Sequence, residues 1–234
     1  MVLPTFAVVA PSLHSTAPRI RPAGVDIDMT TALHASQRID LHGPLATDAA
    51  ARSSARVTSV LDKGSAAVIE TTTSVADPNG TPLWTATSCT FARGEGGFGG
   101  DRGAPRPPGP PPREPDAVLV TPTLPQQALL YRLVGDRNPL HFRPSYAARA
   151  GFPRPILHGL CTYGMVCKAV VDAELGGEVA LVGSYSARFS GVVYPGETLR
   201  TSVWREDGRI VLATTVDERG DAPALSDAQL VLVS

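Results

Sequence analysis

The chain has 234 residues, of which 43% are hydrophobic and 18% are charged, and its formal net charge is −1. This is enough sequence for one large domain or two small ones. A net charge near zero, without a prominent basic run, argues against nucleic acid as a partner. There is no run of about 18 apolar residues, and the apolar N-terminal segment lacks a positive flank. We therefore predict neither a membrane span nor a signal peptide.

The first half of the chain alternates strand-like runs with turns. Three runs rich in apolar and β-branched residues are separated by clusters of Asp, Gly, Asn and Ser, which is typical of antiparallel hairpins. The expected strands cover residues 55–61, 66–75 and 82–91, and the expected turns cover residues 62–65 and 77–80.

A segment rich in glycine and then proline, residues 94–115, divides the chain. Such a composition cannot build a core, so we predict an extended connector. Gly94, Gly96 and Gly99 have the spacing of a dinucleotide fingerprint, but prolines follow them where that fingerprint requires a helix, so we reject a nicotinamide site. The predicted units are an N-terminal half, a linker and a C-terminal catalytic half, at residues 1–100, 101–116 and 117–234.

The segment from Tyr131 to His141 reads YRLVGDRNPLH and combines a carboxylate, an amide and an imidazole. In an uninterrupted helix, Asp136 and His141 would lie roughly 140° apart around the axis. Pro139 favours a bend after Asn138, and a bend can turn both side chains towards one pocket. Asp136 and His141 are then suited to acid/base chemistry on a water that Asn138 could hold. The alternative is a plain turn, in which Asp136 caps a backbone amide and His141 packs.

Residues 157–171 are almost all apolar or small, which predicts a buried helix. Gly159 lies in its first turn, where backbone N–H groups lack helical partners and can polarise a carbonyl or thioester oxygen. We interpret His158 as a residue at the helix start whose ring is satisfied by local contacts. Cys89, Cys161 and Cys167 have no metal-ligand spacing, so we predict reduced thiols, no metal site and a cytoplasmic location.

The last part of the chain repeats the plan of the first half. Turns at 206–208 and 218–221 separate three more strand-like runs, and residues 188–193 before a Pro-Gly pair mirror residues 37–41 before a Gly-Pro pair, so we predict a structural duplication. These strand-like runs cover residues 198–205, 209–216 and 225–233.

Two motifs, YRLVGDRNPLH at 131–141 and PILHGL at 155–160, resemble the hydratase 2 family of (R)-specific enoyl-CoA hydratases in the MaoC-like group. The resemblance is greatest to the two-hot-dog hydratases, including the hydratase unit of the peroxisomal multifunctional enzyme type 2. It implies an α+β double hot-dog fold, in which each half wraps an antiparallel sheet around a mainly apolar helix. The further matching segments are residues 60–64, 96–100, 186–189 and 193–199.

The beginning of the chain departs from the two-hot-dog pattern. Residues 2–9 match a segment that lies well inside the first half of those hydratases. We therefore expect the first hot dog to be short at its N-terminus, through either a misassigned start codon or a naturally trimmed half.

The resemblance also implies roles for individual residues. Asp136 and His141 match the catalytic pair, which activates water for addition to a trans-2-enoyl thioester. Asn138 matches the residue that helps to place the water, and the Gly159 amide matches the oxyanion donor. Without the resemblance, Lys63 would be merely a solvated residue at a hairpin tip. Besides these four site residues, the implied acyl-CoA contacts are His34, Ala35, Lys63, Arg137, Pro139, Leu140 and Phe189.

The resemblance implies reversible hydration of trans-2-enoyl-CoA to (3R)-3-hydroxyacyl-CoA in fatty-acid metabolism, without a metal or redox cofactor. One alternative is dehydration of 3-hydroxyacyl groups on acyl carrier protein, and another is a non-catalytic acyl-CoA-binding subunit. The expected partners are an acyl-CoA thioester and a second copy in a homodimer, with neither nucleic acid nor a membrane.

Overall fold

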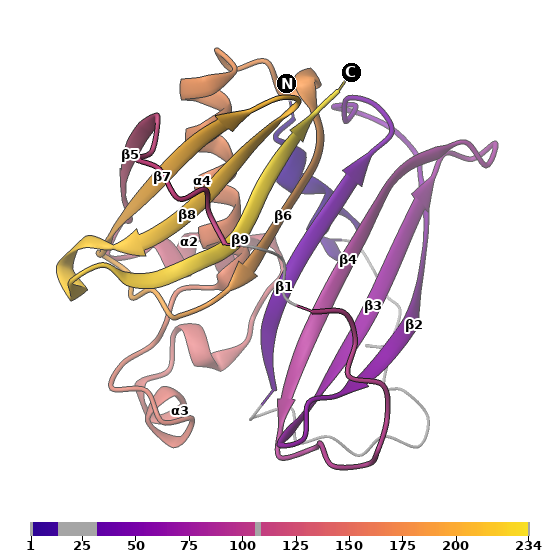
Figure 1. Cartoon of the computed structure of the whole chain (residues 1–234). Coiled ribbons are helices and arrows are strands. Elements are labelled where there is room, and N and C mark those ends of the chain that lie inside the picture. Colours follow the sequence, from indigo (N-terminus) through magenta and orange to yellow (C-terminus); the bar gives the residue numbers. More distant parts are fainter. Residues whose placement is uncertain (1, 14–31, 106–108, 234) are drawn as a thin grey trace.

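The computed structural model describes residues 2–13, 32–105 and 109–233. Within these residues, nine strands form a single antiparallel sheet, and one long helix packs against it (Figure 1). The strand order across the sheet is β2-β3-β4-β1-β6-β9-β8-β7-β5. The first half of the chain supplies β1 to β4 and the second half supplies β5 to β9, so each half forms one continuous side of the sheet.

The first half folds into the predicted hairpins. Its tight turns contain Gly64 and Gly80 at positive φ, a backbone conformation that glycine adopts without steric cost. Residues 37–41, the segment that mirrors 188–193, belong to a further strand, β1, which lies between β4 and the second half of the chain. The four strands are β1 (Ala32–Leu41), β2 (Arg52–Asp62), β3 (Ala66–Ala76) and β4 (Pro82–Arg93).

Helical structure in the described part of the first half is short. It consists of the 3-10 helix η1 (Pro4–Val8) and the single turn α1 (Ala10–Leu13). The indole Nε1 of Trp84 in β4 donates a hydrogen bond of 3.0 Å to the carbonyl of Ala7, which holds η1 against the sheet. A long apolar helix was predicted for each half. Among the described residues, only the second half contains one.

The second half contains the other strands and the long helix. Its strands are β5 (Ala117–Pro122), β6 (Val182–Phe189), β7 (Thr198–Glu206), β8 (Arg209–Val216) and β9 (Ala222–Leu232). Its α-helices are α2 (Gln127–Tyr131), α3 (Pro144–Arg149) and α4 (Gly159–Glu174). Its 3-10 helices are η2 (Arg132–Val134), η3 (Pro139–His141), η4 (Val179–Leu181) and η5 (Asp217–Arg219). The sequence analysis did not predict β5.

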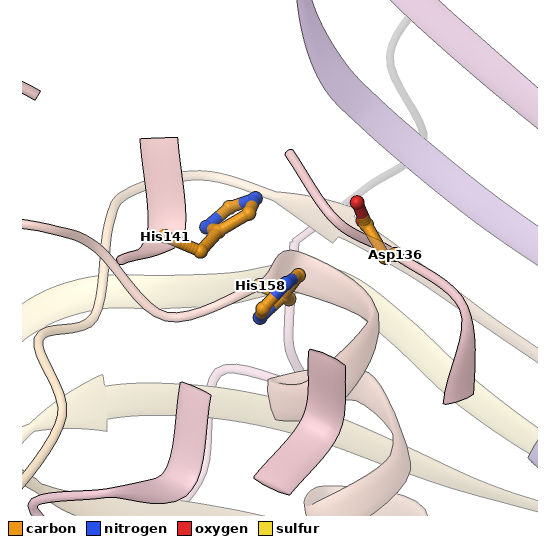
Figure 2. Close-up of side chains that lie close together, drawn as sticks. All are labelled: Asp136, His141 and His158. Atoms are coloured by element: carbon orange, nitrogen blue, oxygen red, sulfur yellow. The ribbon is translucent and has the colours of Figure 1, made fainter. Parts of the chain in front are cut away.

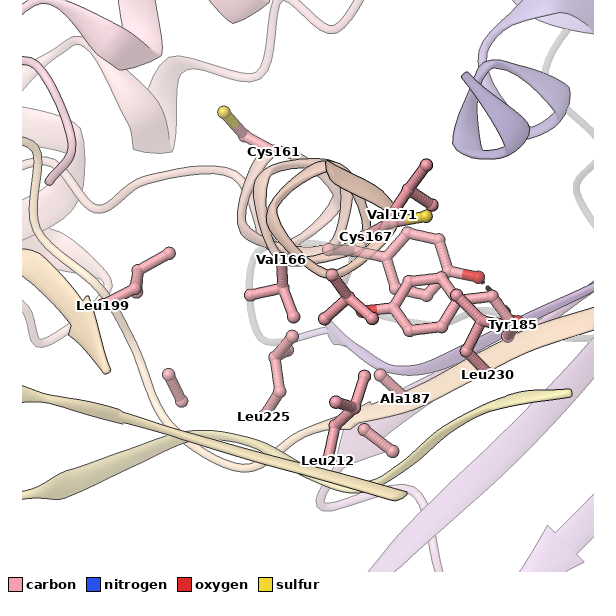
Figure 3. Packing of buried hydrophobic residues seen from close by; sticks show 14 of the residues in the cluster. Cys161, Val166, Cys167, Val171, Tyr185, Ala187, Leu199, Leu212, Leu225 and Leu230 are labelled. Atoms are coloured by element: carbon pink, nitrogen blue, oxygen red, sulfur yellow. Dashed lines mark hydrogen bonds between the residues drawn. The ribbon is translucent and has the colours of Figure 1, made fainter. Parts of the chain in front are cut away.

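Helix α4 is the predicted apolar helix, and it forms the centre of the core. Figure 3 shows Val166 on the side that faces Leu212 and Leu225 of the sheet, whereas Cys161 points away from them. Both Cys161 and Cys167 are free thiols, and burial raises the pKa of each to about 12, in keeping with the predicted buried, reduced state. Across the described residues, no helix has the length and apolar character needed to cross a membrane.

Pairing between β1 and β6 joins the two halves edge to edge. The register runs from Ser36 opposite Arg188 to Asp40 opposite Ser184. On the two sides of this seam the strand orders mirror each other, with β1, β4, β3, β2 on one side and β6, β9, β8, β7 on the other. The mirrored order confirms the predicted duplication and the double hot-dog class, with the two sheets fused into one.

Asp62 at the end of β2 anchors the beginning of the predicted connector. Its carboxylate accepts hydrogen bonds from the amides of Gly64, Gly97 and Gly99 at 2.7, 2.8 and 2.7 Å, and these donors lower its pKa to about 2. A Cβ on Gly96 would lie 2.5 Å from the backbone at residues 64 and 66. The glycine-rich part is thus packed against the β2–β3 turn, and no helix follows it in residues 97–105 or 109–116.

We expect Leu212→Ala to lower the free energy of unfolding by about 2–5 kcal/mol, because this leucine is 1% exposed beneath α4 and its loss leaves a cavity. Leu181 is 44% exposed, so Leu181→Ala should change stability by less than about 0.5 kcal/mol. Urea denaturation followed by circular dichroism measures both. Equal losses in the two variants would contradict this description of the core.

Candidate active site

A cavity of about 420 Å³ opens where the seam meets the start of α4. The first half contributes the beginning of β1 and the end of β4 to its wall. The second half contributes the loop before η3, the first turn of α4 and the end of β6. Neither half alone encloses this space.

Most of the residues predicted to form the site line this cavity. The exceptions are Lys63, Arg137 and Pro139. Arg137 is exposed, and Pro139 begins η3 and so shapes the loop. The predicted residues that line the cavity are His34, Ala35, Asp136, Asn138, Leu140, His141, Gly159 and Phe189.

The loop from Gly135 to His141 is both a turn and a wall of the cavity. The Asp136 carboxylate accepts a hydrogen bond of 3.0 Å from the Asn138 amide, and Asn138 Oδ1 accepts one of 3.1 Å from the Leu140 amide at the start of η3. These acceptors satisfy the backbone amides on either side of Pro139, which has no N–H of its own. The capping predicted by the plain-turn alternative therefore occurs, and the same turn directs Asp136 and His141 into one cavity.

One hydrogen bond determines which nitrogen of His141 can act on a ligand. Nδ1 lies 2.9 Å from the carbonyl oxygen of Ile156. A carbonyl only accepts, so Nδ1 carries the proton and the Nε2 lone pair is left free in the neutral ring. Burial lowers the pKa of His141, although the Ile156 carbonyl and the charge of Asp136 act in the opposite direction. The imidazole is therefore neutral, and ready to accept a proton, at neutral pH.

Asp136, His141 and His158 place their side-chain ligand atoms within 4.8 Å of one another (Figure 2). No direct hydrogen bond joins Asp136 to His141, which leaves room for a bridging water-sized group. The rings of His141 and His158 are stacked, with centroids 3.7 Å apart and planes 27° apart. An ion about 2.0–2.1 Å from a nitrogen of each ring would lie well outside at least one ring plane, so this arrangement suits proton transfer better than metal ligation.

His158 corrects the sequence interpretation, which assigned it only local contacts. Its ring is 2% exposed and lies between His141 and Tyr131, whose centroid is 4.8 Å away. Neither ring nitrogen makes a hydrogen bond of normal geometry with the described residues. Burial, followed by repulsion from His141, lowers the pKa of His158 to about 4. A buried imidazole without partners is costly, which is typical of a site kept for function.

Gly159 is the first residue of α4, and its backbone amide has no helical partner at that position. The ring of Phe189 lies against it, because a Cβ at residue 159 would be 3.1 Å from two ring carbons. Glycine therefore permits close packing of Phe189 and leaves the amide accessible from the cavity. This geometry is compatible with the predicted oxyanion donor.

His34 brings a third imidazole to the cavity from the first half. The pairing of β1 with β4 shifts register between His34 and Ser36, so Ala35 occupies a β-bulge. The His34 ring lies 4.7 Å from the ring of Phe189 across the seam, and its Nε2 is buried without a partner among the described residues. Burial lowers the pKa of His34 to about 4.

Lys63 lies outside the cavity, in the turn between β2 and β3. Its Nζ donates to the carbonyl of Arg102. Its backbone amide donates to Ala66, which pairs with Arg93 of β4, so Lys63 and Arg93 share one end of the sheet. Lys63 therefore does not face the reacting atoms, and the contact with CoA predicted for it would involve a part of CoA outside the catalytic cavity.

Comparison with known proteins agrees with this fold. The family described as "MaoC like domain" matches residues 105–224, and the family described as "MFE-2 hydratase 2 N-terminal domain" matches residues 1–94.

Individual relatives cover nearly the whole chain. Enoyl-CoA hydratase ChsH3 of Mycobacterium tuberculosis is 52% identical over 98% of this chain and 81% of the relative. The 3-hydroxyacyl-thioester dehydratase Y of the same organism is 46% identical over 92% of this chain and 75% of the relative. The crystal structure of a MaoC-like dehydratase from Phytophthora capsici superposes with a TM-score of 0.90 at 33% identity, covering 99% of this chain and 82% of that one. The chain belongs to the MaoC-like dehydratase family, and its first half is a hydratase 2 N-terminal domain.

Proposed function

We propose that this protein catalyses the reversible hydration of trans-2-enoyl-CoA to (3R)-3-hydroxyacyl-CoA in fatty-acid metabolism. The proposal rests on one observation. Asp136, His141 with its free Nε2, and Gly159 with its backbone amide all line the same cavity. The relatives named enoyl-CoA hydratase support the substrate class. The (3R) configuration rests on membership of the hydratase 2 group. No metal or redox cofactor is part of the proposal.

In the proposed reaction, a water molecule occupies the space between Asp136, Asn138 and His141. Its oxygen bonds to C3 of the enoyl group while the Nε2 lone pair of His141 accepts one of its protons. The thioester oxygen, which gains negative charge, accepts a hydrogen bond from the Gly159 amide. The acid/base pair then returns one proton to C2, so that H and OH have been added on the same face.

The name of one relative, 3-hydroxyacyl-thioester dehydratase, leaves room for a second substrate class. The same residues can remove water from a 3-hydroxyacyl group carried by acyl carrier protein, because the reacting atoms are identical. Comparison of kcat/KM for crotonyl-CoA and crotonyl-acyl carrier protein distinguishes the two carriers. A non-catalytic acyl-CoA-binding subunit is the weaker alternative, since such a subunit needs neither Asp136 nor His141.

The cysteines support a cytoplasmic location as part of the proposal. Cys89, Cys161 and Cys167 are all free, and a thiol-only chain suits a reducing compartment.

We also propose that the protein forms a homodimer through the sheet edge at β5. Val118 and Val120 on this edge strand are 42% and 58% exposed, and Leu129, Leu130 and Leu133 nearby are 53%, 46% and 80% exposed. An open strand edge beside exposed apolar side chains is suited to a subunit interface.

We expect both His141→Ala and Asp136→Ala to lower kcat at least about 100-fold with crotonyl-CoA, because each removes a group that moves or positions the proton. The loss of enoyl-thioester absorbance measures turnover, and chiral analysis identifies the alcohol. His42→Ala and Asp48→Ala, two exposed positions away from the cavity, are the matched controls. Wild-type activity in both catalytic variants, or a 3S product, would overturn the proposed function.

The pH dependence of kcat/KM should show the lowered pKa of His141. Above that pKa the ring is neutral and accepts a proton, so activity should persist as the pH falls to 6.5 and decline only at lower pH. The decline should remain in His158→Phe, because phenylalanine retains the stacked ring but cannot titrate. Loss of this acidic limb in His158→Phe would assign it to His158 in place of His141.

Light scattering after size-exclusion chromatography tests the homodimer. We expect a dimer for the wild type and a monomer for Val120→Glu, because the substitution buries an unpaired charge in the interface. Val60→Glu, on the opposite edge strand β2 and 39% exposed in the wild type, should remain dimeric. A monomeric wild type would refute this assembly.

A further inference from the structure

A two-pronged ion pair joins two loops of the second half behind the wall of the catalytic cavity. Nε and Nη2 of Arg219, at the end of η5, donate to the two carboxylate oxygens of Glu197 at 2.8 and 3.2 Å. Glu197 ends the loop between β6 and β7, residues 190–197, which we call the β6–β7 loop. Its side chain is 7% exposed, and that of Arg219 is 30% exposed. Neither residue lines the catalytic cavity, and the proposed reaction uses neither.

The pair also holds the backbone of the β6–β7 loop. Glu197 Oε2 accepts a hydrogen bond of 2.7 Å from the Tyr194 amide, and Arg219 Nη2 donates to the Val192 carbonyl. The Arg219 guanidinium lies over the Tyr194 ring, 5.4 Å from its centroid. A buried ion pair often adds little net stability, because its two charges lose their hydration. The geometry here instead fixes the loop on both sides of Val193.

The fixed part of the β6–β7 loop contacts the segment before α4. The Leu157 amide donates a hydrogen bond of 2.7 Å to the Val193 carbonyl. The side chains of Val192 and Tyr194 pack against the small core cluster that contains Ile156. Backbone and side-chain contacts thus both tie the position of residues 156 and 157 to the β6–β7 loop.

Ile156 connects this support to the catalytic base. Its carbonyl oxygen lies 2.9 Å from Nδ1 of His141, which keeps the proton on Nδ1 and the lone pair on Nε2. A retreat of that oxygen by about 0.7 Å would lengthen the contact to about 3.6 Å, where it is no longer a hydrogen bond. The neutral ring would then populate both tautomers. In the second tautomer Nε2 carries the proton and cannot accept one from water.

We infer that Glu197 and Arg219 are positioning residues for His141. Their ion pair holds the β6–β7 loop, the loop holds the segment before α4, and the Ile156 carbonyl of that segment keeps His141 in the Nδ1–H tautomer. The catalytic consequence rests on the proposed function and deepens it, whereas the tautomer itself requires no substrate. The base is thus oriented by groups that do not touch the substrate.

Kinetics test the catalytic consequence. The double substitution Glu197→Gln with Arg219→Met removes both charges at once, so that neither is left buried without its partner. We expect kcat with crotonyl-CoA to fall about tenfold with little change in KM, because the base is misoriented while the substrate contacts remain. Arg219→Lys, which keeps the charge but loses the two-pronged donor, should lie between the double variant and the wild type.

A second Arg–Glu pair provides a matched control. Nε and Nη2 of Arg205 donate to the carboxylate of Glu174 at 2.6 and 3.0 Å, and the Glu174 side chain is 4% exposed. Glu174 is the last residue of α4, at the opposite end from Gly159. Glu174→Gln with Arg205→Met should therefore keep the wild-type kcat. An equal fall of kcat in both double variants would overturn the inference, since the loss of any such ion pair would then have the same effect.

A spectroscopic measurement separates this inference from the proposed function. In protein whose histidines carry isotope-labelled nitrogen, NMR distinguishes protonated from unprotonated ring nitrogens, and the His141→Ala variant identifies the His141 signals. We expect Nδ1–H alone in the wild type and in the control. The Glu197→Gln/Arg219→Met variant should show a mixture of tautomers, whether or not the protein hydrates enoyl thioesters.

Urea denaturation identifies a variant that does not fold, and Arg219→Lys then carries the same measurement. A folded variant with an unchanged His141 tautomer would overturn the inference even if its activity fell, because the ion pair would then only stabilise the fold.

Discussion

Backbone pairing between β1 and β6 is the interaction on which the rest of the structure depends. It turns two sheets into one and brings the start of β1 beside the end of β6. The ring contact between His34 and Phe189 crosses this seam, and Phe189 in turn packs against Gly159 at the start of α4. The catalytic cavity thus exists only when both halves are folded and joined, which couples site formation to assembly of the whole sheet.

Burial is the second constraint, and it acts on three imidazoles at once. His34, His141 and His158 all have lowered pKa values, and in each the largest cause is loss of solvent around the ring. Hydrogen bonding then separates their roles. His141 has one nitrogen occupied by the Ile156 carbonyl and one free, whereas neither nitrogen of His158 makes a hydrogen bond of normal geometry with the described residues. A cluster of neutral rings around one correctly oriented base suits chemistry in which protons move.

Local signals predicted most of the fold, because hairpin turns, apolar runs and the Asn138-Pro139 bend are each encoded within a few residues. Strand β5 escaped because its run is short and its pairing partner, β7, lies far along the chain, so no hairpin turn joins the two. The environment of His158 could not be predicted from neighbouring residues in the sequence, because Tyr131 and His141 come into contact with it only when the chain folds. The same holds for Asp62, which binds amides 35 and 37 residues away. The domain limits and the roles of the site residues remain predictions.

The mirrored strand order on the two sides of the seam gives the molecule an approximate twofold axis between β1 and β6. Such an axis relates the two ends of the seam, so the position equivalent to the catalytic cavity lies near the end of β1 and the start of β6. A cavity of about 530 Å³ lies near this end of β1, bordered by Phe6, His42 and Trp84, and all of its lining residues belong to the first half. Because that cavity takes no residue from β6 or β9, the symmetry of the strand order does not extend to the cavities, and among the described residues only one end of the seam brings the two halves together around an acid/base pair.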